Sequence, residues 1–317
     1  MSDIFRSLED VSNPENVPTP RPSTTALPEV ERTQTRRRTA DEEFSPLTPL
    51  RTYELNEKLM SESIPLRPLI APIESMLELR AEYEGGSQEF VQQIDWLVAN
   101  GWKGVRRARG DGDCFYRSLA FAYVERILQN PEPVMGVTSA ISLLEVSQPM
   151  LEVAGFEPVV FEDFYEVFVS IINRIIIPGP DGELLTPITL LEAFNNDEVS
   201  NSIVAYLRLL TSAQIREDPE SYAAFLFHPE SGESMDVRSF CENFVESVGK
   251  EADHVQITAL SRVMKVNIDV AYLDGHTAEK VDFVHFHNTD YSGLEPIILL
   301  YRPGHYDILD QREYEEL

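Results

Sequence analysis

A thiol at the start of an apolar periodic segment could perform nucleophilic catalysis. Cys114 follows Asp111-Gly112-Asp113, and the apolar residues after it recur at helical spacing: Leu119, Ala122, Tyr123, Ile127 and Leu128. The spacing predicts that Cys114 lies in the first turn of a helix, where unpaired N–H groups and the positive end of the dipole favour a thiolate. The Asp-Gly pair predicts a turn in which the aspartate caps the helix and backbone N–H groups can bind an oxyanion.

His305 is the best candidate for the base that the thiol needs. Residues 296–300 form an apolar run typical of a buried strand, and Pro303-Gly304 then predicts a turn into a returning strand at residues 305–309. Because strand side chains alternate between faces, Asp307 shares a face with His305. Asp307 could therefore hold one imidazole nitrogen and leave the other for the thiol.

Two observations oppose this interpretation. Asp111 and Asp113 place two negative charges beside the thiol, which disfavours a thiolate, so a protonated histidine must outweigh them. A lone cysteine is also more often a packed residue than a nucleophile, and His305 with Asp307 could be an ordinary surface pair on an edge strand. The glycine loop before the cysteine and the His-x-Asp strand together favour catalysis.

The other cysteine and the other histidines fit catalysis less well. Cys241 lies in an apolar helical stripe, so we expect it to pack in the core. His285 and His287 share a strand face and, with Asp290 nearby, could form a metal pair, but no third ligand stands at a recognisable spacing, and no metal site is predicted. The remaining histidines stand beside an aspartate or among turn residues: His228, His254 and His276.

Four ordered segments resemble the otubains, cysteine proteases of the ovarian-tumour (OTU) family that remove ubiquitin from proteins. The segments are Asp111-Gly112-Asp113-Cys114-Phe115-Tyr116-Arg117, residues 204–212, Phe240-Cys241 followed by Glu251-Ala252-Asp253-His254, and residues 301–309. The resemblance runs from about Met76 to Leu309 and implies an OTU-type papain-like cysteine protease fold. It also implies four site residues: the nucleophile Cys114, the general base and acid His305, its orienting partner Asp307, and Asp111, whose loop backbone helps to form the oxyanion site. The chain departs from the family at Asp113, usually an asparagine, and at Gly110, commonly a proline.

The resemblance implies hydrolysis of the isopeptide bond between ubiquitin and lysine through an acyl-thioester, without a metal or organic cofactor. Polyubiquitin is the expected substrate, with the lysine-48 linkage favoured. An alternative is a non-catalytic regulator that binds ubiquitin or a ubiquitin-conjugating enzyme. A thiol hydrolase for another ubiquitin-like modifier is a third hypothesis.

Composition sets limits on partners and compartment. The 317 residues carry a formal net charge of −28, which argues against nucleic acid as a partner. Two distant cysteines provide no disulfide framework, so we expect a reducing cytoplasm or nucleus. The chain opens with no secretory signal, and residues 164–177, the most apolar stretch, are interrupted by polar residues, so no membrane span is predicted. A monomer is expected.

The chain divides by composition near residue 72. Residues 1–72 are rich in Pro, Ser, Thr and charge, which predicts a disordered tail, and residues 73–317 form the predicted catalytic domain. Helices are predicted at 76–84, 90–98, from 114, and at 162–175, 190–194, 199–215, 236–249 and 255–265, and strands at 266–272, 281–284, 296–301 and 305–309. Helices before strands predict an α+β domain in which helices pack on a small, mostly antiparallel sheet.

Overall fold

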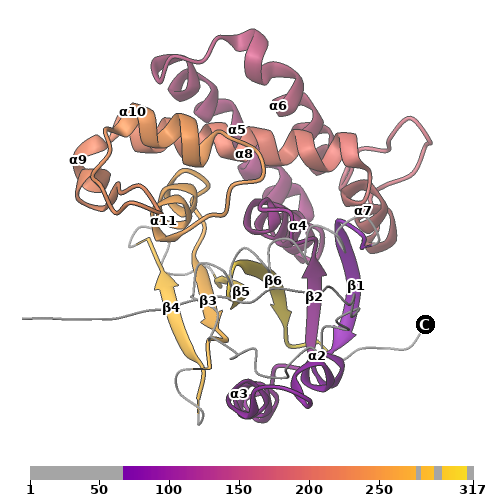
Figure 1. Ribbon diagram of the computed structural model, residues 1–317. Coiled ribbons are helices and arrows are strands. Elements are labelled where there is room, and N and C mark those ends of the chain that lie inside the picture. Colours follow the sequence, from indigo (N-terminus) through magenta and orange to yellow (C-terminus); the bar gives the residue numbers. More distant parts are fainter. Residues whose placement is uncertain (1–66, 276–279, 289–294, 313–317) are drawn as a thin grey trace, which may run out of the picture. The chain divides into compact units, whose positions relative to one another are not determined.

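A single mixed sheet forms the centre of the structure, which is a computed structural model describing residues 67–275, 280–288 and 295–312. The strands are β1 (Ile70–Ser75), β2 (Gly104–Ala108), β3 (Ile268–Tyr272), β4 (Asp282–Phe286), β5 (Ile297–Arg302) and β6 (His305–Asp310). They follow the order β1-β2-β6-β5-β3-β4, and every pairing is antiparallel except that of β3 with β5 (Figure 1). The predicted mostly antiparallel sheet is confirmed.

Helices surround this sheet and complete the α+β class. They are α2 (Met76–Tyr83), α3 (Gln88–Ala99), α4 (Cys114–Leu128), α5 (Pro133–Val153), α6 (Pro158–Asn173), α7 (Pro187–Phe194), α8 (Asp197–Glu217), α9 (Pro219–Tyr222), α10 (Val237–Phe240) and α11 (His254–Val263). A 3-10 turn, η2 (Ala223–Phe225), and a π-helical turn, η3 (Cys241–Val245), lie between α9 and α11. The predicted helix over 236–249 is therefore wrong in extent, because its second half winds as a π-turn and ends at residue 245.

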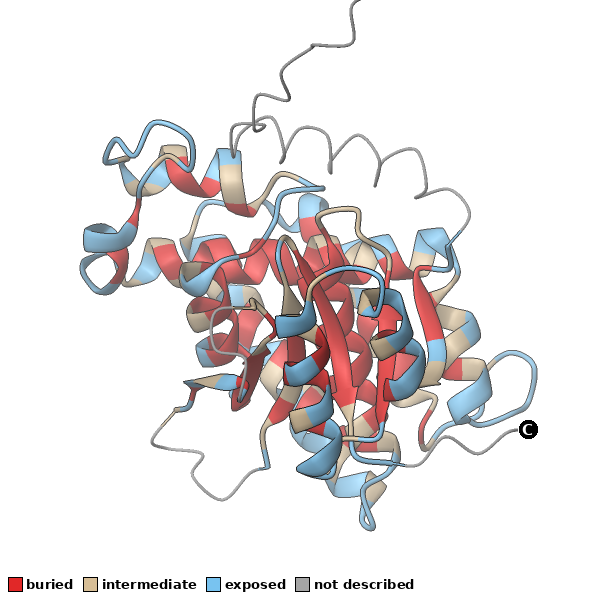
Figure 2. Cartoon of the chain, turned by 60° about the horizontal axis from the view of Figure 1, so that its bottom comes forward, coloured by how far each residue is buried: buried red, intermediate tan, exposed pale blue. Residues whose placement is uncertain are grey.

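The two faces of the sheet bury different cores because strand side chains alternate. On β5, Leu299 belongs to the large core beneath α4 and α8, whereas Leu300 belongs to the smaller core under α2 and α3. On β6, Ile308 and Leu309 divide in the same way. Figure 2 shows the buried strands between the helices.

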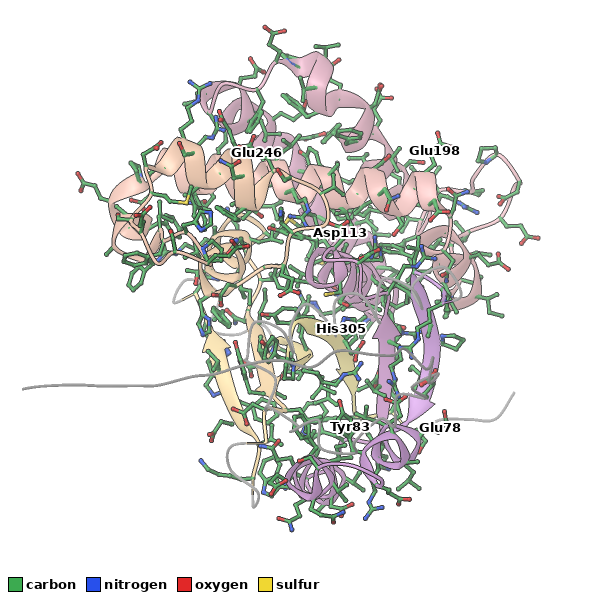
Figure 3. All side chains as sticks on the ribbon, in the orientation of Figure 1. Glu78, Tyr83, Asp113, Glu198, Glu246 and His305 are labelled. Atoms are coloured by element: carbon green, nitrogen blue, oxygen red, sulfur yellow. The ribbon has the colours of Figure 1, made fainter. Side chains whose placement is uncertain are left out.

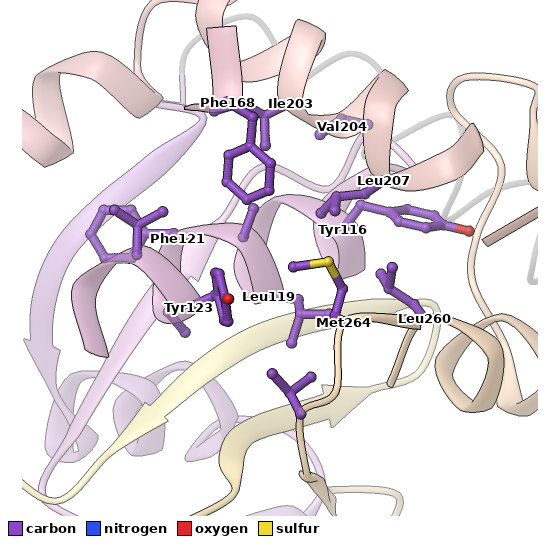
Figure 4. Packing of buried hydrophobic residues seen from close by; sticks show 14 of the residues in the cluster. Tyr116, Leu119, Phe121, Tyr123, Phe168, Ile203, Val204, Leu207, Leu260 and Met264 are labelled. Carbon is purple, nitrogen blue, oxygen red and sulfur yellow. The ribbon is translucent and has the colours of Figure 1, made fainter. Parts of the chain in front are cut away.

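Helix α4 is buried on almost every side, as expected for a helix at the centre of a core. It packs against β6 on one side and α8 on another. Figure 4 shows apolar side chains of α4 in the same core as those of neighbouring helices. Tyr116, Leu119 and Phe121 come from α4, Phe168 from α6 and Leu207 from α8. The first residue of α4 is therefore held on a rigid element beside the last strand.

The sequence pattern did not predict the two early strands, β1 and β2. β2 contains Arg106 and Arg107 and lacks the apolar alternation of a strand, yet every residue in it is buried. Arg106 pairs with Glu125 at 3.2 Å and Arg107 with Glu74 at 3.2 Å, so ion pairs make burial of these charges tolerable. The expectation that strands come only after helices is wrong, since β1 and β2 precede α4. β1 begins at Ile70, and the predicted tail boundary near residue 72 remains a prediction, because residues 1–66 lie outside the described residues.

Helix α5 is another element that the periodicity did not predict. Among the described residues it is the one helix that is long and apolar enough to cross a membrane. Of its 18-residue apolar stretch, 28% is buried inside the protein. It contains Pro149 and packs against α4, α6 and α8, and one such helix is weak evidence for a membrane. Residues 164–177, considered from sequence, instead lie in α6 and the turn after it.

Candidate active site

Cys114 is the first residue of α4, as predicted, and is 2% exposed. Asp113 occupies the N-cap position but makes no side-chain capping bond. The Asp111 carboxylate instead accepts a hydrogen bond from Asp113 N at 3.1 Å, a side-chain turn that shapes the loop. The predicted aspartate cap of the helix is therefore wrong, although the predicted turn is present.

Two buried arginines neutralise the carboxylates that the sequence places beside the thiol. Asp111 pairs with Arg117 at 2.8 Å, and Asp113 pairs with Arg208 at 2.5 Å. Each arginine is 1% exposed, so the attraction is little screened by solvent. A protonated histidine therefore has less negative charge to outweigh than the sequence suggests, because these arginines already offset both aspartates.

Arg208 also holds the loop before Cys114 against a distant segment. Its guanidinium donates to the carbonyl oxygens of Gly112 at 3.1 Å, Val245 at 2.9 Å and Lys250 at 2.7 Å. It also lies over the ring of Tyr116, 4.3 Å from the centroid. Arg208 thus joins α8, the start of α4 and residues 245–250 in one buried cluster.

Gly112 occupies a position where a side chain could be accommodated only if the backbone shifts. Its φ is +80°, and a Cβ there would lie 2.1 Å from the carbonyl oxygen of Gly249. Asp111 N donates to Arg109 O at 3.0 Å, so its N–H is already used within the loop. Asp113 N likewise donates to Asp111 Oδ1, so the N–H groups of Gly112 and Cys114, beside and at the helix start, are the loop's remaining candidate donors for an oxyanion.

His305 lies on β6, beside the loop that begins α4, and is 5% exposed (Figure 3). Its Nε2 is 2.8 Å from Asp307 Oδ1, and Tyr306 N lies 3.4 Å from Cys114 Sγ, to which it donates. The buried Nδ1 of His305 has no hydrogen-bond partner among the described atoms. Strand alternation therefore lets Asp307 hold one imidazole nitrogen of His305, as predicted, and the use of the other nitrogen as the base for the thiol stays a prediction.

Charges around His305 favour the imidazolium. Burial alone lowers the pKa of His305, but the negative charges of Asp307 and the Cys114 thiolate outweigh burial and raise it to about 10. Burial would raise the pKa of Asp307, whereas His305 and Arg302 hold it well below its usual range. The surroundings of His305 therefore favour its protonated form, which can donate a proton, beside an ionised Asp307.

Arg302 is a site residue that sequence reasoning did not assign. It donates from Nε and Nη2 to Asp307 Oδ2, at 3.0 and 2.6 Å, and Ala108 N donates to Oδ1 at 3.0 Å. Arg302 and His305 are partners across the Pro303-Gly304 turn, so the hairpin register was a signal that could have found it. These contacts fix the carboxylate that orients the imidazole.

The remaining candidates lie elsewhere. Cys241 is fully buried, as predicted, and burial raises the pKa of its thiol. His254 is exposed beside Asp253 at the start of α11. His285 and His287 both contact Asp269, a carboxylate that spacing did not reveal. His228 accepts hydrogen bonds from backbone N–H groups within its own turn, and His276 and Asp290 lie outside the described residues.

Comparison with known proteins identifies the family. Residues 62–311 match the family described as Peptidase C65 Otubain. The chain belongs to the otubain family. The resemblance that rested on four short segments is therefore confirmed over most of the chain.

The chain is similar to proteins named as a deubiquitinating enzyme and as a ubiquitin thioesterase. It is 35% identical over 254 residues to the ovarian tumor domain-containing deubiquitinating enzyme 1 of Arabidopsis thaliana, covering 76% of this chain and 80% of that protein. It is 34% identical over 205 residues to the ubiquitin thioesterase OTUB2 of Homo sapiens, covering 65% and 80%. Among solved structures it is similar to a complex described as h/ceOTUB1-ubiquitin aldehyde-UBCH5B~Ub, with a TM-score of 0.68, 26% identity, and coverage of 82% of this chain and 96% of that one. The predicted OTU-type fold is confirmed.

Proposed function

We propose that this otubain is a deubiquitinating thiol protease that hydrolyses isopeptide bonds between ubiquitin and lysine. The observation that carries the proposal is the buried cluster of Cys114, His305 and Asp307. Asp307 contacts Nε2 of His305, Nδ1 of the same ring has no hydrogen-bond partner among the described atoms, and the backbone N–H of the next residue, Tyr306, donates to Cys114 Sγ. The relatives named as ubiquitin thioesterases and as a deubiquitinating enzyme support ubiquitin as the acyl group. In this proposal Cys114, His305, Asp307 and Asp111 have the roles that the resemblance implies.

The chemistry follows from the geometry. The Cys114 thiolate attacks the carbonyl carbon of the isopeptide bond, and the N–H groups of Gly112 and Cys114 bind the resulting oxyanion. His305 donates its proton to the leaving lysine amine, which leaves ubiquitin as a thioester on Cys114. His305 then removes a proton from water, which attacks the thioester and releases ubiquitin with a free carboxylate. None of these steps uses an organic cofactor or a metal.

Asp307 and Arg302 act through His305. Asp307 holds Nε2, which keeps the opposite nitrogen on the side of Cys114. Arg302 holds the other carboxylate oxygen of Asp307, so the carboxylate cannot rotate away from the ring. Asp111 contributes by shaping the loop through Asp113 N and Arg117.

A binding role is the second candidate, and one observation favours it. The similar solved structures are described as complexes that contain ubiquitin aldehyde together with UBCH5B~Ub or UBC13~Ub, so surfaces of related chains hold such partners. Here this otubain would bind ubiquitin or a ubiquitin-conjugating enzyme without needing its thiol. A hydrolase for a different ubiquitin-like modifier would instead need the same thiol.

The test compares wild type with Cys114→Ala and His305→Ala in a di-ubiquitin cleavage assay and a binding assay with a ubiquitin-conjugating enzyme. The protease proposal expects both variants to lose cleavage while they keep binding. Wild type that binds but does not cleave would favour the regulator. C-terminally activated probes of several modifiers identify the cognate one, because it should label Cys114 fastest.

We also propose a preference for lysine-48-linked chains and a location in the cytoplasm or nucleus. The family resemblance supports the first. Two free cysteines, each buried and distant in sequence, support a reducing compartment. Cleavage of every linkage type at matched concentration, and imaging of a tagged full-length chain, test the two proposals separately.

A further inference from the structure

Three metal-ligand side chains converge at the far edge of the sheet. Asp269 lies on β3, and its direct partner in the β3–β4 register is His285. His287 follows β4 by one residue and lies two positions after His285. Asp269 Oδ1 lies 2.8 Å from His285 Nδ1 and 2.6 Å from His287 Nε2. A single carboxylate oxygen of Asp269 therefore lies within hydrogen-bond distance of both imidazole rings.

This cluster lies apart from the proposed active site. The strand order places β5 between β6, which carries His305, and β3, which carries Asp269. The two histidines belong to β4, at the end of the sheet, and to the segment directly after it. The proposed mechanism uses none of the three residues.

We propose that Asp269, His285 and His287 form a binding site for a divalent transition-metal cation, with Zn²⁺ as the best fit. Two imidazole nitrogens and one carboxylate oxygen match the ligand set that Zn²⁺ takes, whereas Ca²⁺ and Mg²⁺ select oxygen ligands. All three donor atoms lie within 4.8 Å of one another. A His-x-His pair with a carboxylate on the neighbouring strand brings three donors to one side of a hairpin.

The geometry needs only a small adjustment to accept the ion. Tetrahedral donors about 2.0–2.1 Å from zinc are about 3.4 Å apart, slightly farther than the two contacts observed. The side chains of His285 and His287 are 56% and 48% exposed, so they have room to turn outward. The Asp269 side chain is only 12% exposed and provides the fixed ligand.

The exposure of the two imidazoles means that the proposed ion would be open to solvent on one side. Three protein ligands leave one coordination position, which faces solvent and can hold water or a side chain from another protein. The bound ion would link β3 to β4, an edge strand that pairs with β3 alone among the described strands. Cation binding should therefore stabilise the folded chain as well as create an open ligand position.

Zinc binding is measured in the full-length, tag-free Cys114→Ala chain, because a catalytic thiol beside an imidazole could also bind zinc. Competition with a chromophoric chelator gives the stoichiometry and Kd, and Co²⁺ absorption reports the coordination geometry. We expect one Zn²⁺ per chain, a tetrahedral Co²⁺ spectrum and a rise in Tm on adding Zn²⁺. Removing a ligand should weaken binding by at least about 10-fold, as loss of even an outer-shell partner does.

The variants His285→Gln with His287→Gln, and separately Asp269→Asn, should lose the site. His254→Gln is the matched control, because His254 is also an exposed histidine beside an aspartate but has no third ligand among the described residues. The proposal is overturned if the Cys114→Ala chain binds no Zn²⁺. It is equally overturned if the double glutamine variant, folded by circular dichroism, binds Zn²⁺ with unchanged affinity.

Discussion

Replacing Gly112 with alanine separates loop geometry from general stability. Both Gly112 and Gly155 have positive φ, at +80° and +96°. The left-handed backbone alone should therefore make alanine at either position cost about 1–2 kcal/mol of unfolding free energy. At Gly155 an added Cβ would meet no atom within 4 Å, whereas at Gly112 the Gly249 carbonyl oxygen would lie 2.1 Å away. Only Gly112→Ala must push the loop away from residues 249–250.

The displaced loop carries the N–H groups assigned to the oxyanion. Loss of one such donor costs roughly 10²–10³ in kcat, or about 2.7–4 kcal/mol of transition-state stabilisation. We therefore expect Gly112→Ala to lower kcat by at least about 10²-fold, while Gly155→Ala keeps wild-type kcat with a loss of stability alone. The assay is cleavage of a fluorogenic ubiquitin C-terminal amide, with urea unfolding measured in parallel. Equal kcat values for the two folded variants would refute the assignment of the loop.

Three further outcomes follow from the buried charges and thiol. Arg208→Met should lower the unfolding free energy by about 3–5 kcal/mol because it leaves the buried Asp113 carboxylate without its partner. Arg238 forms an exposed ion pair with Glu242, so Arg238→Met should change that free energy by less than about 1 kcal/mol in the same urea titration. The raised pKa of His305 contributes stability that is present below pH 6.5 and lost as pH rises toward 10. Asp307→Asn should therefore flatten the dependence of the unfolding free energy on pH between those values, and parallel pH profiles for variant and wild type would contradict this. Cys241→Ala should leave iodoacetamide labelling of the folded enzyme unchanged, since burial raises the pKa of the Cys241 thiol, and reduced labelling would disagree with the assignment.

Short-range periodicity predicted the main parts of the site. The 3.6-residue period placed Cys114 at a helix start, and the two-residue period placed His305 and Asp307 on one strand face, because both periods follow from local backbone geometry. The turn at Pro303-Gly304 predicted the hairpin for the same reason. These positions agree with the structure.

Long-range partners could not be predicted this way. Arg208 contacts Asp113 across 95 positions of sequence, and the apolar period of either segment does not report that contact. β2 was missed because Arg106 and Arg107 make it look exposed, although their partners allow it to be buried. Asp269 was missed as a neighbour of the two histidines because only strand register brings it opposite His285.

The most direct test of the central claim uses a ubiquitin with an electrophilic C-terminus. Mass spectrometry should map one covalent ubiquitin adduct to Cys114, and His305→Gln should slow adduct formation by at least about 10²-fold, the usual contribution of a positioned acid or base. An adduct on Cys241, or a His305→Gln variant that reacts at the wild-type rate, would contradict the account.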